Sequence, residues 1–198
     1  MRQARLAAAL PFGVNEDDEG RMAVWLLLVE LTYTEGEAET YAIPVAWAAG
    51  GRAAELAAEH PNAVVARLRT QPRGGGGEAR AESGILYDAL VEPAFARFLL
   101  GTIAGKRAIK GPDGEIVGVP APPLAALRAG LAAFEPHLGR AEQSNSSVLF
   151  GDQLILKLFR KVEPGVNPDL EIGRFLAAQG FEHTPPLAGW LELRRGRV

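Results

Sequence analysis

Two short apolar runs, joined by a tight turn and followed by a helical segment, constrain the fold of this chain more than any other feature. Residues 147–150 and 153–159 each have the length of a strand, and the Gly-Asp pair between them suits a turn between antiparallel strands. After a connection rich in proline and glycine, residues 169–179 have the apolar spacing of a helix, which Gly180 ends. The pattern predicts an antiparallel hairpin followed by a helix.

Two further strand candidates, residues 138–143 and 187–193, flank this arrangement. The predicted order is then three strands, one helix and one strand. This order is typical of the nucleotide-binding half of a kinase-like lobe, where a lysine in a strand and a carboxylate in the following helix hold phosphate groups. We therefore look for those two side chains in the matching positions.

Lys157 lies in the second apolar run, and Glu171 follows it by fourteen residues, in the predicted helix. If strand and helix pack together, the carboxylate can hold the ammonium group against a phosphate. Each residue also has a simpler interpretation. A lysine in an edge strand extends its charge into water, and a glutamate in the first turn of a helix is stabilised by the helix dipole.

Four small polar residues, Ser144, Asn145, Ser146 and Ser147, stand immediately before and at the start of the first apolar run. Their backbone N–H groups and hydroxyls are suited to covering phosphates, with less backbone freedom than glycine would give. Taken alone, such a run is an ordinary polar turn. Its position ahead of the lysine strand favours the phosphate-covering loop.

The preceding residues predict an α+β region with antiparallel pairing. Residues 22–33 and 38–45 form a hairpin whose Tyr41, Ile43 and Val45 share one face, and Pro44 indicates a strand end or a sheet edge. The remaining predicted elements are a helix at 53–59, a strand at 63–68, a helix over 83–100 restarted at Pro93, a hairpin of 107–110 with 115–119 and an amphipathic segment at 124–131. We predict two domains: residues 1–133 as an antiparallel-sheet cap domain with helices, and residues 134–198 as a partial kinase-like nucleotide lobe.

Composition excludes several classes of function. The net charge of −3 argues against a nucleic-acid or anionic-membrane surface, and no apolar run is long enough to span a bilayer. The chain has no cysteine, which excludes disulfides and thiolate metal sites and fits the cytoplasm. The apolar start, residues 1–10, is too short and lacks a cleavage site, so we expect no export.

Two other motifs are set aside. Four consecutive glycines at 74–77 lack the flanking strand, helix and lysine of a phosphate loop, so they predict a surface loop. His60, His137 and His183 have no metal-ligand spacing and predict no zinc site.

The motifs together resemble bacterial maltokinase. The resemblance is carried by residues 142–147, 156–160, 163–176 and 185–189, and upstream by 27–33, 39–44 and 86–90. It implies ATP-dependent phosphorylation of maltose to maltose 1-phosphate in α-glucan metabolism, in an enzyme that stands alone or is fused to trehalose synthase. Carried over, Ser144, Asn145, Ser146 and Ser147 cover the phosphates, Lys157 contacts them and Glu171 pairs with Lys157.

The same resemblance implies that the catalytic aspartate and the Mg²⁺ ligands lie beyond Val198. We expect the chain alone to be inactive and to self-associate through an uncovered apolar face. Two alternatives stay open. One is a noncatalytic binding module, and the other is a kinase-like phosphotransferase that acts on another sugar or on an aminoglycoside.

Overall fold

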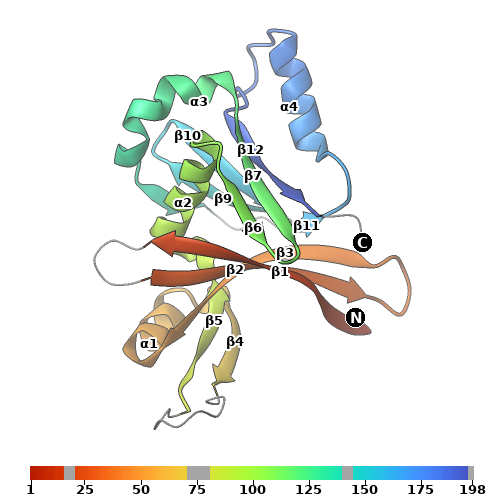
Figure 1. The fold of residues 1–198 in the computed structure, drawn as a ribbon, viewed down its shortest axis with the longest axis vertical. Coiled ribbons are helices and arrows are strands. Elements are labelled where there is room, and N and C mark those ends of the chain that lie inside the picture. Colours follow the sequence, from red (N-terminus) through yellow and green to blue (C-terminus); the bar gives the residue numbers. More distant parts are fainter. Residues whose placement is uncertain (16–20, 71–80, 140–144, 196–198) are drawn as a thin grey trace.

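The computed structural model describes residues 1–15, 21–70, 81–139 and 145–195, and this part of the chain is α+β, as predicted (Figure 1). Its strands are β1 (Gln3–Asn15), β2 (Arg21–Thr32), β3 (Glu39–Ala49), β4 (Val64–Arg69), β5 (Ser83–Asp88), β6 (Ala108–Gly111), β7 (Gly114–Pro120), β8 (Pro136–Leu138), β9 (Asn145–Phe150), β10 (Leu154–Phe159), β11 (Lys161–Val162) and β12 (Gly189–Arg194). Its helices are α1 (Gly50–Glu59), α2 (Pro93–Ala104), α3 (Pro122–Leu127) and α4 (Pro168–Ala178), with short 3₁₀ helices η1 (Pro61–Ala63), η2 (Ala89–Val91) and η3 (Arg128–Ala133). Within these ranges no helix has both the length and the apolar character that crossing a membrane requires.

The largest sheet has the order β1-β2-β3-β5-β4, with β11 added to β3. The predicted β2–β3 hairpin is confirmed, with Leu26 opposite Pro44. Strand β1 was not expected from its sequence, although its residues Ala8, Leu10 and Phe12 alternate into the core as a strand requires. The predicted glycine loop at 74–77 lies outside the described residues.

We had expected Pro44 to end its strand or to lie at a sheet edge, and this prediction is wrong. One side of β3 pairs with β2, and the other side pairs with β11 near its start and with β5 near its end. The N–H of Ala42 donates to the carbonyl of Arg160 at 2.7 Å, and pairing with β5 begins only at Val45. Pro44 falls between these two stretches, on the side where its missing N–H costs no ladder hydrogen bond. In β3 the core cluster takes Ala42, Ala46 and Ala48, which alternate with the predicted set of Tyr41, Ile43 and Val45. Of that predicted set, Val45 is also buried, at 2% exposure.

The predicted helix over residues 83–100 is wrong in its first half. Residues 83–88 form β5, which lies between β3 and β4, and the helix α2 begins at Pro93. The strand buries Ile85 and Tyr87 at alternate positions. Gly84 explains the close approach, since a Cβ there would lie 2.6 Å from the ring of Trp47 on β3.

Helix α2 ends in a Schellman turn that leads directly into the predicted β6–β7 hairpin. The N–H of Arg107 donates to the carbonyl of Thr102 at 3.0 Å, and that of Lys106 donates to Ile103 at 3.1 Å. Lys106 consequently has a φ of 53°, in the left-handed region where glycine is usual.

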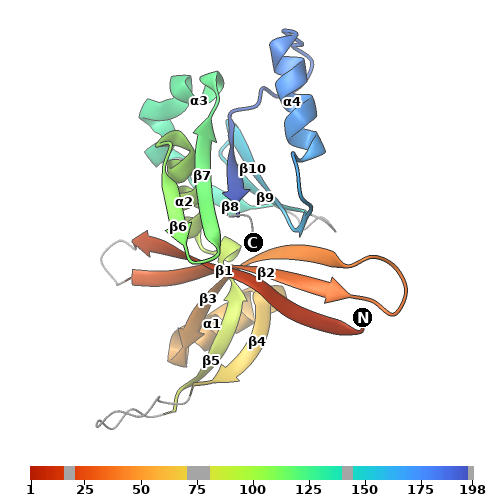
Figure 2. The same cartoon turned by 45° about the vertical axis from the view of Figure 1, so that its right-hand side comes forward.

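In the second region, residues 134–198, the predicted strands at 147–150 and 153–159 and the helix and strand after them are confirmed as β9, β10, α4 and β12, with the unpredicted β11 before the helix. The predicted strand at 138–143 overlaps the short β8 only at Leu138, and most of it lies outside the described residues. Strands β8, β9 and β10 form an antiparallel sheet of their own. Strands β11 and β12, however, join sheets of the first region, pairing with β3 and β7. The division at residue 133 stays a prediction. In both ribbon views α4 stands at the periphery of the fold, on the side opposite α1 (Figure 1, Figure 2).

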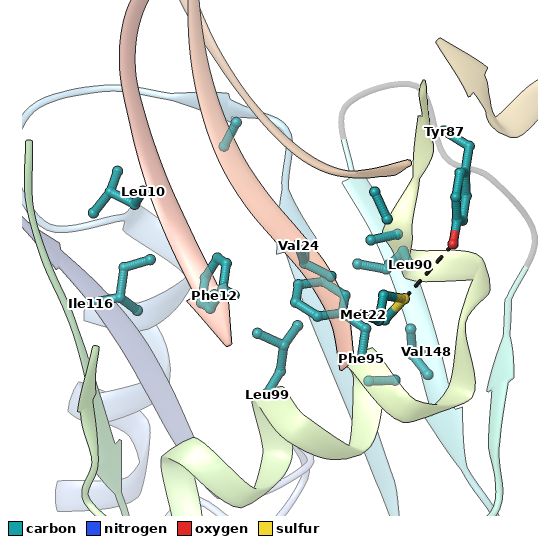
Figure 3. Packing of buried hydrophobic residues seen from close by; sticks show 14 of the residues in the cluster. Leu10, Phe12, Met22, Val24, Tyr87, Leu90, Phe95, Leu99, Ile116 and Val148 are labelled. Carbon is teal, nitrogen blue, oxygen red and sulfur yellow. Dashed lines mark hydrogen bonds between the residues drawn. The ribbon is translucent and has the colours of Figure 1, made fainter. Parts of the chain in front are cut away.

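One hydrophobic cluster includes residues of both regions. Phe95 of α2 is 1% exposed and its ring meets that of Phe12 edge-on, with centroids 5.6 Å apart. Val148 and Phe150 of β9, 1% and 0% exposed, belong to the same cluster. Figure 3 shows Val148 beyond Phe95 and Met22. The small sheet is therefore anchored on the common core by one face.

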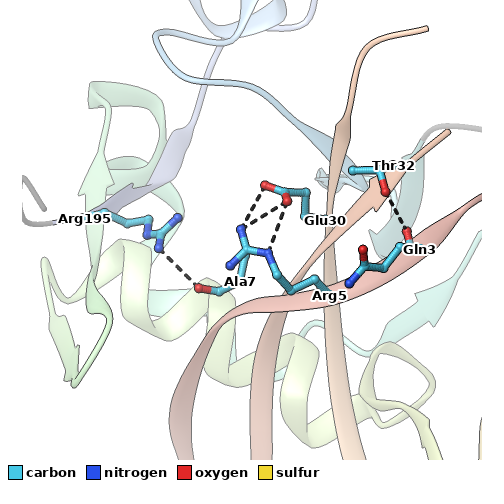
Figure 4. Close-up of polar contacts among 6 residues, drawn as sticks. All are labelled: Gln3, Arg5, Ala7, Glu30, Thr32 and Arg195. Atoms are coloured by element: carbon cyan, nitrogen blue, oxygen red, sulfur yellow. Dashed lines mark hydrogen bonds and ion pairs between the residues drawn. The ribbon is translucent and has the colours of Figure 1, made fainter. Parts of the chain in front are cut away.

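Side chains cover part of the outer edge of β1. The guanidinium of Arg195 donates to the carbonyl of Ala7 at 3.3 Å (Figure 4), and the N–H of Ala9 donates to the carboxylate of Asp113 at 2.9 Å. These contacts occupy backbone groups that would otherwise be open to another strand.

Candidate functional site

The β9–β10 hairpin places Lys157 directly opposite Ser147 and Ile155 opposite Leu149. Residues that face each other across an antiparallel pair, and those two apart along a strand, share one face of the sheet. These four side chains therefore form one surface, which we call the outer face. Ile155 is 60% exposed and Leu149 38%, so this face is open to solvent.

The outer face is exposed because the other face of the hairpin supplies the packing. Val148 and Phe150 are buried, and Leu154, Leu156 and Leu158 pack against the core cluster. The alternation is therefore complete, and a lysine at position 157 must point away from the core. The interpretation of Lys157 as a solvent-exposed strand residue and its interpretation as a phosphate contact are both compatible with this placement.

Lys157 reaches α4, but it pairs with Asp169 instead of Glu171. Its Nζ lies 4.0 Å from Oδ2 of Asp169, with the side chains 48% and 59% exposed. Residues two apart on a helix point in different directions, so a strand that meets Asp169 cannot also meet Glu171. An ion pair this exposed and this long contributes little to stability, which leaves the ammonium available to another anion.

Glu171 lies elsewhere on α4. Together with Val166, Arg174 and Phe175 it lines a shallow hollow of about 370 Å³. The guanidinium carbon of Arg174 lies 5.5 Å from the ring centroid of Trp190, a cation–π contact that ties α4 to β12. Phe175 is 62% exposed and Val166 58%, so the hollow has uncovered apolar walls.

The expected phosphate-covering loop is partly strand. Asn145, Ser146 and Ser147 are paired residues of β9, while Ser144 lies outside the described residues. Ser146 occupies the inner face, where its hydroxyl accepts hydrogen bonds from Nε and Nη2 of Arg160 at 3.0 and 2.8 Å. Of the predicted serines that the structure describes, only Ser147 lies on the outer face with Lys157.

The sequence analysis placed Arg160 and Asp88 in the ranges that carry the resemblance but did not predict that the two residues pair. Nη2 of Arg160 lies 2.6 Å from Oδ2 of Asp88, and the side chains are 18% and 20% exposed. A usable signal was present, since an arginine directly after an apolar strand must find a partner if its head group is withdrawn from water. The partner itself stands 72 residues earlier in the chain and could not be identified from spacing.

A second polar cluster surrounds Glu39, where β11 meets β3. Its carboxylate accepts hydrogen bonds from Tyr33 at 2.6 Å, Lys161 at 3.0 Å and Tyr41 at 3.0 Å. These bonds, that from Tyr33 foremost, lower the pKa of Glu39 to about 2. The hydrogen bond to Glu39 in turn raises the pKa of Tyr33 to about 12. The cluster borders a hollow of about 200 Å³. The hydrogen bond between Lys161 and Glu39 links β11 to β3.

The described residues contain no group of three or more acidic or histidine side chains that could hold a metal ion. In the comparison with known protein families, no family model matches this chain.

Proposed function

We propose that this chain is the ATP-holding part of an ATP-dependent sugar kinase of the maltokinase type, with maltose as the acceptor of the phosphoryl group. The observation that carries the proposal is the outer face, where Ser147 and Lys157 stand opposite each other beside Leu149 and Ile155. We place the protein in the cytoplasm as part of the same proposal.

The outer face combines the two chemistries that a nucleotide needs. Lys157 offers an exposed ammonium and Ser147 a hydroxyl, both of which can contact phosphate oxygens. One residue pair further along the hairpin, Leu149 and Ile155 offer an exposed apolar surface on which a planar base can lie. The polar and apolar parts follow one another along the same two strands, as phosphates and base do along a nucleotide.

The described residues contain no cluster that would hold Mg²⁺ by protein ligands alone. Asp169, which pairs with Lys157, is a single carboxylate beside the outer face, and in nucleotide sites one or two such carboxylates hold Mg²⁺ together with the phosphate oxygens. We therefore assign no step of the reaction to a metal bound by these residues. The proposal is limited to nucleotide binding by the outer face, with the sugar specificity resting on the resemblance alone.

The test is calorimetric titration of the purified chain with Mg²⁺-ATP at low ionic strength. We expect saturable binding that Lys157→Ala weakens about tenfold or more, because an ion pair with phosphate is lost. Lys110→Ala removes another exposed lysine, from β6, and is the matched control, expected to bind within about twofold of the wild type. Absent binding, or equal affinity in Lys157→Ala, would refute the proposal.

Turnover is a separate measurement. We expect the isolated chain to bind ATP but not to transfer phosphate to maltose, because the proposal assigns nucleotide contacts to the outer face and no catalytic base. Phosphorus NMR of ATP with maltose checks this. A maltose 1-phosphate signal that disappears in Lys157→Ala would contradict the expectation while supporting the kinase assignment.

A second candidate function is a noncatalytic binding module, favoured by the apolar side chains that α4 leaves uncovered. Ile172 is 56% exposed and Phe175 62%, next to Val166. Exposed apolar surfaces of this kind mark sites of protein association. ATP titration distinguishes the two, since saturable binding that depends on Lys157 favours the kinase. Light scattering tests the apolar surface itself: Phe175→Ser should reduce self-association and leave ATP affinity unchanged.

A further inference from the structure

We propose that Arg160 is the positioning residue of the ATP site: by holding Ser146 on the inner face of β9, it fixes Ser147 on the outer face beside Lys157. The inference rests on the proposed function, and it assigns to the site a residue that does not touch the nucleotide. It also makes Asp88, from the first region, part of the support of that site.

The planar guanidinium of Arg160 contacts Ser146 and Asp88 at the same time. Nε and Nη2 both donate to the hydroxyl of Ser146, and Nη2 also faces the carboxylate of Asp88 at 2.6 Å. Three contacts from one rigid, planar group fix its direction, which a flexible lysine ammonium could not do. The charges are mostly withdrawn from water, so losing any one partner leaves a poorly solvated polar group.

The backbone of Arg160 is held as firmly as its side chain. The residue stands between β10 and β11, and its carbonyl accepts the N–H of Ala42 on β3 at 2.7 Å. Asp88, at the end of β5, is itself fixed because its Oδ1 accepts the N–H of Leu90 at 2.9 Å. Arg160 therefore joins β9 to two neighbouring strands of the large sheet, β3 and β5.

The consequence for the outer face follows from strand geometry. Adjacent side chains of a strand point to opposite faces, so a fixed Ser146 determines where Ser147 points. Ser147 lies opposite Lys157, and Ser146 lies opposite Leu158, whose side chain packs against the core. If Ser146 were released, β9 could twist or fray at its first residues, and Ser147 would no longer be held next to the ammonium group.

If the ion pair between Arg160 and Asp88 served stability alone, its loss would have a different effect on ATP affinity. Loss of such a pair lowers the melting temperature but leaves the affinity of the folded protein for ATP unchanged. A positioning role lowers the affinity of molecules that are still folded, and it makes the effects of Arg160 and Ser146 substitutions overlap, because both remove the same constraint.

The experiment compares Arg160→Lys, Ser146→Ala, the double variant and Asp88→Asn by Mg²⁺-ATP titration well below each melting temperature. Arg52→Lys is the matched control, since Arg52 also places a guanidinium against a carboxylate, at 2.8 and 3.1 Å from Glu92, but on α1. Amide hydrogen exchange of residues 145–148 reports on the order of β9 in the same samples.

We expect each of the three single variants to bind ATP about five- to tenfold more weakly than the wild type, with faster amide exchange at Ser147. The double variant should bind ATP no more weakly than whichever of Arg160→Lys and Ser146→Ala binds it more weakly. Arg52→Lys should match the wild type in both readouts. Wild-type ATP affinity in Arg160→Lys and Ser146→Ala, or an additive double variant, would overturn the inference while the proposed function stood. A wild type that binds no ATP would refute both.

Discussion

Gly118→Ala tests a close approach between the strand β7 and the helix α2. A Cβ at position 118 of β7 would lie 2.6 Å from the carbonyl carbon of Thr102 and 2.8 Å from Cα of Ile103, both backbone atoms of α2. Ordinary contacts between carbon atoms are about 3.5–4.0 Å. Strand and helix would have to separate by roughly 1 Å, since neither clash involves a side chain that could rotate away.

The cost follows from what that separation would disturb. The Thr102 carbonyl accepts the N–H of Arg107 in the turn that ends α2, and the N–H of Gly118 donates to the Arg107 carbonyl at 2.9 Å. The Thr102 side chain is fully buried. We therefore expect the upper part of the range for overpacking, about 3 kcal/mol. For a chain of this length that is a fall in melting temperature of roughly 6–12 °C.

The assay is urea unfolding followed by circular dichroism, with thermal unfolding as a second measure. Gly101→Ala is the matched control, because Gly101 lies on the same helix and a Cβ there would have nothing within 4 Å. It should stabilise the protein by about 0.5–1 kcal/mol through helix propensity. A Gly118→Ala protein within about 0.5 kcal/mol of the wild type would show that β7 and α2 are not in the contact described.

Two further predictions concern single side chains. Lys106→Gly should raise the unfolding free energy by about 1 kcal/mol, because it removes a side chain from a backbone with a φ of 53°; urea unfolding measures it, and a loss of stability would contradict the reasoning. Folding lowers the pKa of Glu39 from 4.5 to about 2, so its contribution to stability is complete above about pH 4.5 and is lost as the pH falls toward 2. Glu39→Gln should therefore flatten the decline of stability over that pH range, and an unchanged slope in unfolding free energy against pH would speak against the assigned hydrogen bonds.

Local sequence signals predicted the turns and helix ends at which a proline or a glycine determines the backbone conformation. The turn between β6 and β7, the end of α1 before Pro61 and the end of α4 before Gly180 were all readable. The strand β5 was not, because a run of six apolar and polar residues ahead of Pro93 has no periodicity long enough to separate a strand from a helix. Its identity is set by β3 and β4 on either side of it.

The candidate site was predictable in its chemistry but not in its pairing. The sequence indicated Lys157 and a neighbouring acidic helix, and the structure brings Lys157 to the start of α4. Whether Asp169 or Glu171 faces the lysine depends on the rotation of α4 about its axis, which is set by Trp190 and the connection before the helix. That rotation is a tertiary property, and the two carboxylates are equivalent in spacing arguments.

The covering of the β1 edge has a consequence for the time course of folding. The hydrogen bond of Ala9 cannot form until Asp113 has been synthesised, and that of Ala7 requires Arg195, which follows it by 188 residues. At a synthesis rate of about 5–20 residues per second, the Arg195 contact becomes possible roughly 10–40 s after Ala7 has been made. The β1–β2 hairpin forms far sooner than that, in microseconds. Until Arg195 has been made, the Ala7 carbonyl on the edge of β1 is therefore open to another strand, and nascent chains on neighbouring ribosomes can pair there.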